Sequence, residues 1–173
     1  MSLRFERLTE PTTETVRAFN RWENDSTIIH LIRPNFTKEE FEHREEVTLS
    51  QLKKRLENHR HYLIYSEDKL IGEMNYMIDP VHLFKREPET AWIGITIGEP
   101  EGRGKGIGFH AIQHLEREIE KEGLKRIELG VFEYNTRAIK LYEKLGYKKI
   151  GELEDFTYWQ DRMWKDIRME KYL

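Results

Sequence analysis

The chain has 173 residues, of which 38% are hydrophobic, so it is long and apolar enough for one folded domain over residues 1–173. It contains no cysteine and carries a net charge of −3, which excludes a disulfide framework and argues against a dedicated nucleic-acid binder. No apolar run reaches the length of a membrane-spanning helix and no signal-peptide core is visible, so we expect a cytoplasmic protein without a membrane partner.

The first sixty residues are predicted to form one strand and two helices. Alternating apolar residues predict a strand over residues 3–8. Apolar residues at helical spacing between positions 16 and 22 predict the first helix, and residues 24–35 show so little periodicity that we expect a loop. Thr37 and Glu40 have the spacing of a capping box, which predicts a second helix over about residues 37–56.

Carboxylates are frequent near the start of that second helix. The usual structure for such a run is a solvated helix face. The alternative is an acidic lip that attracts a cationic substrate, and the sequence leaves both interpretations open. The residues concerned are Glu39, Glu40, Glu42, Glu45 and Glu46, with Glu23 and Asp25 nearby.

The middle of the chain alternates strands with one long helix. Residues 61–65 and 70–78 are predicted to pair as a hairpin. Residues 91–97 form an apolar strand, residues 109–119 show helical spacing, and residues 127–131 alternate again. A strand, a long helix and another strand form a right-handed crossover, so the last two strands should be parallel neighbours.

The end of the chain is predicted to add one helix and two strands. The helix covers residues 135–145, and the strands cover 147–153 and 166–171, joined by an aromatic-rich link over 155–164. The resulting fold class is α/β (α+β), with a single mixed, mostly antiparallel sheet of about six to seven strands and about four helices.

A glycine-rich stretch from Gly98 to Gly108 joins the apolar strand to the long helix. Glycines let backbone N–H groups turn toward a ligand, and a helix N-terminus attracts anions, so the stretch predicts a phosphate site. Arg103 and Lys105 add positive charge. It is not a Walker loop, because Gly106 follows Lys105 where Ser or Thr is required, and it is not a Rossmann loop, because Phe109 takes the last glycine position.

Two motifs resemble those of the GCN5-related N-acetyltransferase (GNAT) family. Residues 103–108, Arg-Gly-Lys-Gly-Ile-Gly, are similar to its loop for the coenzyme A pyrophosphate. Residues 135–147 match the pattern N-x-x-A-[I/V]-x-[L/F]-Y-x-x-x-G-[F/Y] at every position. The resemblance extends over about residues 63–173. Residues 151–169 are similar to a branch containing spermidine, ribosomal-protein N-terminal and aminoglycoside 6′-acetyltransferases.

The resemblance implies an acyl-CoA N-acyltransferase fold and acetyl transfer from acetyl-CoA to a primary amine by direct attack in a ternary complex. In this family a bulge splays the strand before the glycine loop from its parallel neighbour, and the V-shaped opening holds the pantetheine arm. Backbone groups of that strand bind the pantetheine amides and stabilise the oxyanion. The implied acetyl-CoA-binding residues here are Ile95, Ile97, Arg103, Gly104, Lys105, Gly106, Ile107, Gly108 and Asn135.

The resemblance also implies that Tyr142 protonates the leaving thiolate. A phenol is normally protonated up to about pH 10, which suits that role. The alternative is a tyrosine that only packs in the core, just as capping of a helix would by itself account for Asn135. One branch of the family has a Glu twelve residues before the tyrosine, but that position is Gly130 here. Glu73, Glu128 and a water chain therefore remain candidates for the general base.

Other functions and partners stay open on the sequence. A non-enzymatic acyl-CoA-binding module or an ATP-binding protein would also use a glycine loop. We expect coenzyme A and a small cationic amine, a polyamine or an aminoglycoside, as the partners, with a protein N-terminus as the rival acceptor and homodimer formation undecided. No metal is expected, because His110 and His114 lack the third ligand and the Glu of a zinc motif.

Overall fold

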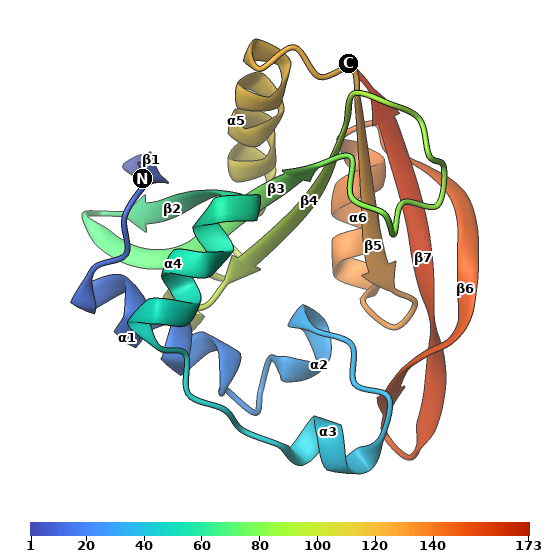
Figure 1. Ribbon diagram of the computed structural model, residues 1–173, viewed down its shortest axis with the longest axis horizontal. Helices are drawn as coiled ribbons and strands as arrows, with labels where there is room; N and C mark the ends of the chain where they lie inside the picture. Colours follow the sequence, from blue (N-terminus) through green and yellow to red (C-terminus); the bar gives the residue numbers. More distant parts are fainter.

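A single mixed sheet organises the chain, and the computed structural model describes all residues from 1 to 173 (Figure 1). The strand order is β1-β2-β3-β4-β5-β7-β6 in this seven-stranded sheet. Only β4 and β5 are parallel; every other pair is antiparallel. The strands are β1 (Leu3–Leu8), β2 (Arg60–Ser66), β3 (Lys69–Ile78), β4 (Thr90–Ile97), β5 (Arg126–Phe132), β6 (Lys148–Trp159) and β7 (Arg162–Tyr172). The predicted mixed, mostly antiparallel sheet and the parallel crossover pair are thereby confirmed.

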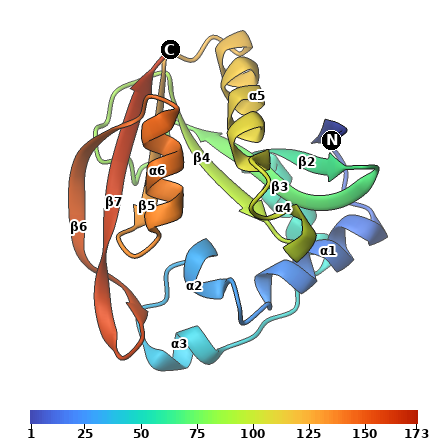
Figure 2. The same ribbon diagram turned by 180° about the vertical axis from the view of Figure 1, so that it is seen from behind.

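Six helices cover the two faces of the sheet, and none is long and apolar enough to span a membrane. Helices α1 and α4 lie on one face over β2 and β3, whereas α5 and α6 lie on the other (Figures 1 and 2). The larger apolar core lies between the sheet and α5 and α6. The helices are α1 (Thr13–Glu23), α2 (Ile29–Ile32), α3 (Lys38–Glu42), α4 (Leu49–Asn58), α5 (Ile107–Lys121) and α6 (Thr136–Lys144).

The segment before β2 differs from the sequence prediction. The expected loop over 24–35 contains the short helix α2, and the expected helix over 37–56 is divided into α3 and α4. The Asn20 side chain accepts a hydrogen bond from the backbone N–H of Val47 and donates one to its carbonyl. Val47 is buried beside α1, so this tertiary contact holds the chain extended where local spacing favoured a helix.

The capping box expected at Thr37 forms only in part. The Thr37 hydroxyl accepts from the Glu40 N–H at 3.1 Å, but the Glu40 carboxylate accepts from the Phe36 N–H instead of returning to Thr37. A complete capping box forms at the start of α4, where Thr48 and Gln51 bond reciprocally. Helix α4 therefore has its own start signal, which explains why it begins as a separate element.

The expected aromatic link over 155–164 belongs to a long hairpin of β6 and β7. Gln160 and Asp161 form its turn with φ angles of 49° and 60°, the left-handed geometry that tight hairpins require. Trp159 and Trp164 both pack against the ring of Tyr134, with centroids 4.3 and 5.3 Å away. This aromatic packing stabilises strand pairing in a segment whose local sequence shows no clear alternation.

The parallel strands β4 and β5 separate soon after they meet. Their pairing covers only Thr90–Trp92 against Arg126–Glu128. Beyond these residues β4 continues with β3 alone and β5 with β7 alone, so the sheet opens into two arms. The opening expected from the family resemblance is present, but β4 pairs with β3 from Ala91 to Ile97 without a register shift, so the expected bulge is absent from that ladder.

Candidate active site

A cleft of about 930 Å³ lies where β4 and β5 part. On the side of α5 and α6 it is bounded by the glycine loop and the first turns of these helices. On the opposite side α2 and the β5–β7 arm form its walls. The volume is in the range of cofactor and substrate sites, and the cleft connects both faces of the sheet.

The glycine loop presents unpaired backbone donors to this cleft. Gly104 and Gly106 have φ angles of 72° and 75°, which turn the backbone into a concave curve. No acceptor within the chain bonds the backbone N–H groups from Gly104 to Gly108, and no side chain caps α5. Because free N–H groups and the positive end of a helix dipole point to one place, the loop can bind a phosphate group.

The Arg103 side chain is used to fix the loop. Its Nε donates to the carbonyl of Ile97 at 3.1 Å, and its Nη2 donates to the carbonyl of Gly98 at 2.7 Å. Asp25 lies 3.8 Å from the same guanidinium. The backbone N–H of Arg103 donates to the Pro100 carbonyl at 3.1 Å, so both its backbone donor and its charge hold the loop in place at the end of β4.

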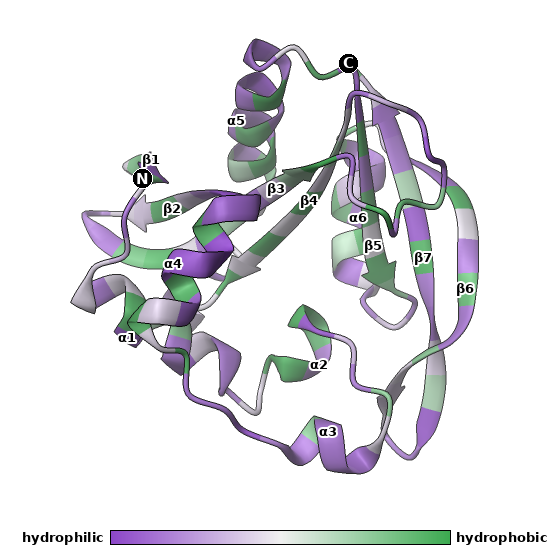
Figure 3. Ribbon diagram, viewed as in Figure 1, coloured by the Kyte–Doolittle hydropathy of each residue, from purple (hydrophilic) through white to green (hydrophobic).

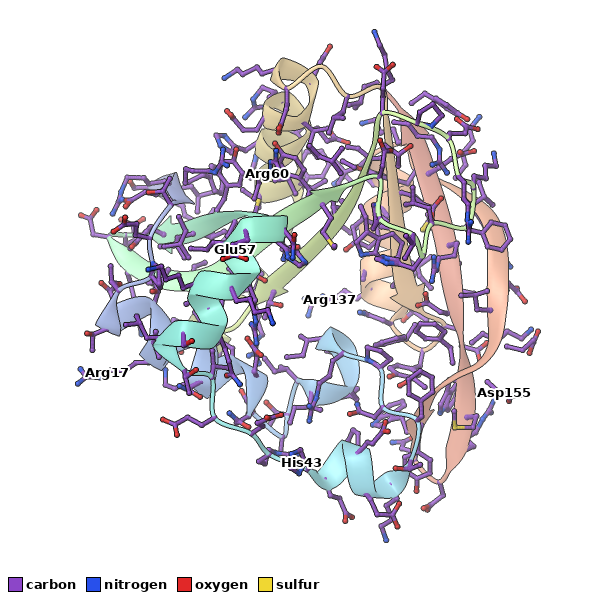
Figure 4. All side chains as sticks on the ribbon, in the orientation of Figure 1. Arg17, His43, Glu57, Arg60, Arg137 and Asp155 are labelled. Atoms are coloured by element: carbon purple, nitrogen blue, oxygen red, sulfur yellow. The ribbon has the colours of Figure 1, made fainter.

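A second arginine, which the sequence analysis did not single out, takes a place beside the loop. Arg137 lies in the first turn of α6 and lines the cleft. Its Nη2 atom lies 3.3 Å from the point that a Cβ atom would occupy at Gly104. Figure 4 shows the labelled Arg137 at the opening between the two arms of the sheet. This exposed guanidinium lies beside the free N–H groups of the loop, so both could contact the same anion.

Replacing Arg137 by Gln should weaken acetyl-CoA binding about 3- to 10-fold, since one charge-assisted contact of about 1 kcal/mol is removed from a partly exposed site. Calorimetric titration at two salt concentrations measures the change. Arg17→Gln is the matched control, because Arg17 projects away from the cleft in Figure 4. Equal affinities in Arg137→Gln and the wild-type chain would show that the guanidinium takes no part in binding.

The exposed edge of β4 offers backbone groups to the cleft. Asp79 donates its N–H to the Thr90 carbonyl, so Thr90 and alternate residues after it bond toward β3. Ile95 and Ile97 therefore direct their backbone groups toward the gap left by β5. A peptide-like arm could bond this edge as an added strand, which is the role that the sequence analysis expected of these two residues.

Tyr142 lies in the cleft on the same side as the glycine loop. It is 8% exposed, and its ring packs edge-on against Tyr147 with the centroids 5.8 Å apart. The hydroxyl makes no hydrogen bond within the chain, and burial raises its pKa to about 12. Tyr142 therefore keeps its proton at neutral pH and has it available for a ligand, while its ring also belongs to the core.

Asn135 both caps α6 and lines the cleft. Its side-chain oxygen accepts a hydrogen bond from the Ala138 N–H at 3.3 Å, which caps α6. The residue also lines the cleft. Its amide nitrogen remains able to donate to a ligand there.

The two candidate bases from the sequence are separated by the fold. Glu73 lines the cleft, where its carboxylate contacts His61 Nδ1 at 3.0 Å and accepts from Asn75. Glu128 is fully buried, accepts backbone hydrogen bonds under the loop between β3 and β4, and bonds Arg126 at 2.7 Å. Glu128 holds that loop in place and does not reach the cleft.

Two charged residues on β7 reach the cleft and were not singled out by sequence. Asp166 and Arg168 are each 3% exposed, and Arg168 Nε donates to Asp166 Oδ2 at 2.8 Å. Both line the cleft on the α2 side. Burial raises the pKa of Asp166. Only the pairing of β7 with β5 brings them to Gly130, so no local signal could have revealed them.

The acidic lip considered from the sequence does not line the cleft. Helix α3 is mostly hydrophilic in Figure 3 and its carboxylates lie on the surface, which agrees with a solvated face. Glu23 is bonded to Arg55 through both carboxylate oxygens. The wall of the cleft on the α2 side is instead largely apolar, formed by Ile28, Leu31, Ile32, Pro34, Phe132 and Phe156. No group of three or more His, Asp or Glu side chains is placed to hold a metal ion.

Comparisons with known proteins agree with this geometry. The profile described as "Acetyltransferase (GNAT) family" matches residues 20–147. A spermine/spermidine N(1)-acetyltransferase of Bacillus subtilis is 30% identical over 92 residues, which are 53% of this chain and 60% of that protein. The chain thus matches less than two thirds of the length of that relative.

Solved structures share the fold over nearly the whole chain. A ribosomal-protein-alanine N-acetyltransferase from Brucella melitensis superposes with a TM-score of 0.76 at 20% identity, covering 100% of both chains. A spermidine N-acetyltransferase from Vibrio cholerae in complex with CoA and spermine gives 0.73 at 20% identity, covering 98% of this chain and 95% of that one. Because the family profile spans residues 20–147, most of its length, this chain belongs to the GNAT acetyltransferase family.

Proposed function

We propose that this chain is an N-acetyltransferase that moves the acetyl group of acetyl-CoA to a primary amine in a ternary complex. The observation that carries the proposal is the cleft, which joins the glycine loop and Tyr142 on one face of the sheet to a chamber with buried carboxylates on the other. Acetyl-CoA supplies an activated acetyl thioester when bound. Family membership and a CoA complex of a structural neighbour support that cosubstrate.

Each group of residues along the cleft has a separate role in the proposed reaction. The N–H groups of Gly104 to Gly108 and the Arg137 guanidinium bind the pyrophosphate. The free edge of β4 at Ile95 and Ile97 orients the pantetheine arm and donates to the oxyanion. Tyr142 donates its proton to the departing sulfur. An acyl-CoA-binding module would need the first two groups but no proton donor, so the unpaired hydroxyl of Tyr142 favours the enzyme.

For the acceptor we propose a small cationic amine, with a polyamine ahead of an aminoglycoside. Glu73 and Asp166 place two carboxylates in a chamber with one apolar wall, and Arg168 offsets only one of these charges, which suits ammonium groups joined by methylene chains. The spermine/spermidine relative supports this choice. A protein N-terminus is the second candidate, favoured by the apolar wall at Ile28 and Leu31, which could receive the first side chains of a peptide.

A turnover screen tests both the proposed acetyltransferase activity and the proposed class of acceptor. Release of free CoA is measured with spermine, spermidine, an aminoglycoside and short peptides, each at low and high salt. We expect turnover with polyamines and a KM that rises steeply with salt, because attraction at long range is screened beyond about 8 Å at physiological ionic strength. Acetylation of peptides alone would select the second acceptor. CoA binding without turnover of any amine would contradict the enzyme.

A further inference from the structure

We propose that Asp166 is the general base that takes the acceptor's proton. Its carboxylate occupies the space that a side chain at position 130 would fill if that residue were not glycine. This inference rests on the proposed function. A Cβ atom at Gly130 would lie 2.5 Å from Oδ2 of Asp166 and 3.0 Å from the ring of Trp92. The absence of a side chain at Gly130 is thus matched by a carboxylate from the neighbouring strand, which occupies the space such a side chain would use.

Strand alternation places Asp166 opposite the proton donor. Ile167 packs in the core that also contains Tyr142, beneath α5 and α6. Because successive side chains of a strand point to opposite faces, Asp166 points to the face that carries α2. An acetyl thioester held in the gap between β4 and β5 would have Asp166 on one side and Tyr142 on the other. Asp166 would then accept the proton of the amine from one face of the sheet, and Tyr142 would donate a proton to the thiolate from the other.

The surroundings of Asp166 leave it capable of accepting a proton. Its Oδ2 accepts one hydrogen bond, from Arg168, while Oδ1 accepts none within the chain. Arg168 is also shared with Glu128, whose Oε2 lies 3.5 Å away, and with the carbonyl of His82. Tyr134 is the other titratable group that interacts with Asp166. Burial raises the pKa of the carboxyl, which makes its anion more basic.

Glu73 faces the same chamber but is engaged differently. Both of its carboxylate oxygens accept hydrogen bonds from Asn75, and Oε2 also contacts His61. Met74 packs in the core under α5, so Glu73 points to the same face as Asp166 from the other arm of the sheet. We assign Glu73 to holding the ammonium group of the acceptor and Asp166 to removing its proton.

The proton balance of the transfer follows from these positions. Asp166 takes one proton from the ammonium and passes it to solvent. The nitrogen then forms a bond to the carbonyl carbon as the carbon–sulfur bond breaks, and the proton of Tyr142 goes to sulfur. The second proton of the nitrogen returns to Tyr142 through water, so the products are the amide, free CoA and one released proton.

The test compares Asp166→Asn with Asp155→Asn, using the amine that the wild-type chain acetylates fastest. Asp155 lies on the outer edge of β6 with a φ of 45°, a conformation that Asn accepts, so it is a matched control (Figure 4). We expect kcat/KM of Asp166→Asn to fall at least about 100-fold. Wild-type kcat/KM should decline at acid pH as Asp166 is protonated and level off once Asp166 is ionised. In Asp166→Asn this plateau should be lost and the decline should extend through neutral pH, because only the neutral amine fraction, set by an amine pKa of about 10, can then react.

Two further readouts separate catalysis from structure. Calorimetric affinity for CoA should stay unchanged in Asp166→Asn, while Glu73→Gln should chiefly raise KM and keep the acidic decline. Gly130→Ala retains every ionisable group but pushes the carboxylate from its place, so it should also lower kcat. This second variant keeps the test decisive if Asp166→Asn does not fold.

The possible outcomes separate the assignment of Asp166 as general base from the proposed acetyltransferase activity. No turnover by the wild-type chain with any amine overturns both. A wild-type chain that is active, with an unchanged acidic decline in Asp166→Asn or full activity in Gly130→Ala, overturns only the assignment of Asp166. Loss of CoA affinity in Asp166→Asn would mean that the residue shapes the cleft rather than acting as the base.

Discussion

Tyr142→Phe should lower kcat about 10²- to 10⁴-fold, the usual effect of removing a general acid, while acetyl-CoA affinity changes little. The substitution keeps the ring that packs against Tyr147 and removes only a hydroxyl that has no partner in the chain. Steady-state assays of CoA release measure kcat, and calorimetric titration measures the affinity for acetyl-CoA. Because the pKa of Tyr142 is about 12, its proton is lost only as pH rises toward that value, so the wild-type rate should not fall from this cause between pH 7 and 9.

Tyr147→Phe is the matched control for this prediction. Tyr147 belongs to the same aromatic pair, but its hydroxyl donates to Glu116 at 2.9 Å inside the core. Its loss should reduce the free energy of unfolding by about 1 kcal/mol and leave turnover intact. Wild-type turnover in Tyr142→Phe would instead show that water protonates the thiolate and that Tyr142 only packs.

Gly106→Glu should weaken acetyl-CoA binding at least tenfold, which corresponds to about 1.4 kcal/mol. Gly106 is the N-cap of α5, and a Cβ atom there would meet nothing within 4 Å, so the new carboxylate would extend into the space for the pyrophosphate. Repulsion between the two anions and the loss of a conformation with φ of 75° act in the same direction. Calorimetry measures the affinity, and circular dichroism checks the fold.

Gly123→Glu separates repulsion from backbone strain. Gly123 follows the other end of α5, has a φ of 90° and is equally open, with nothing within 4 Å of a Cβ atom. It should suffer a similar strain and gain the same charge without any effect on acetyl-CoA affinity. Equal losses of affinity in the two variants would contradict a pyrophosphate site at the loop.

The features predictable from sequence were those encoded within a few residues. The glycine loop, the α5 helix after it and the capped α6 helix follow from spacing and turn chemistry, because the hydrogen bonds that form them are local. The parallel pairing of β4 and β5 followed from the length and handedness of the connection between them. The family motifs added the expectation of an opening between these strands.

Other features depended on partners distant along the chain. Asn20 breaks the expected helix by bonding Val47, 27 positions later, so no local pattern could mark the break. The aromatic segment joined β6 and β7 because Tyr134 lies beside Trp159 and Trp164. In both places a contact between residues distant along the chain overrode the preference of the local sequence.

For the site, the sequence by itself determined the glycine loop at the start of α5, the position of Tyr142 on α6 and the order of the motifs. Only the tertiary structure decided which charges face the cleft. It places Arg137 beside Gly104 and Asp166 beside Gly130. The carboxylates of α3 lie on the surface instead, and Glu128 is buried under the loop between β3 and β4. The physical reason is that a loop of free N–H groups is made by consecutive residues, whereas the electrostatics of a chamber depend on which strands pair and which face each side chain takes.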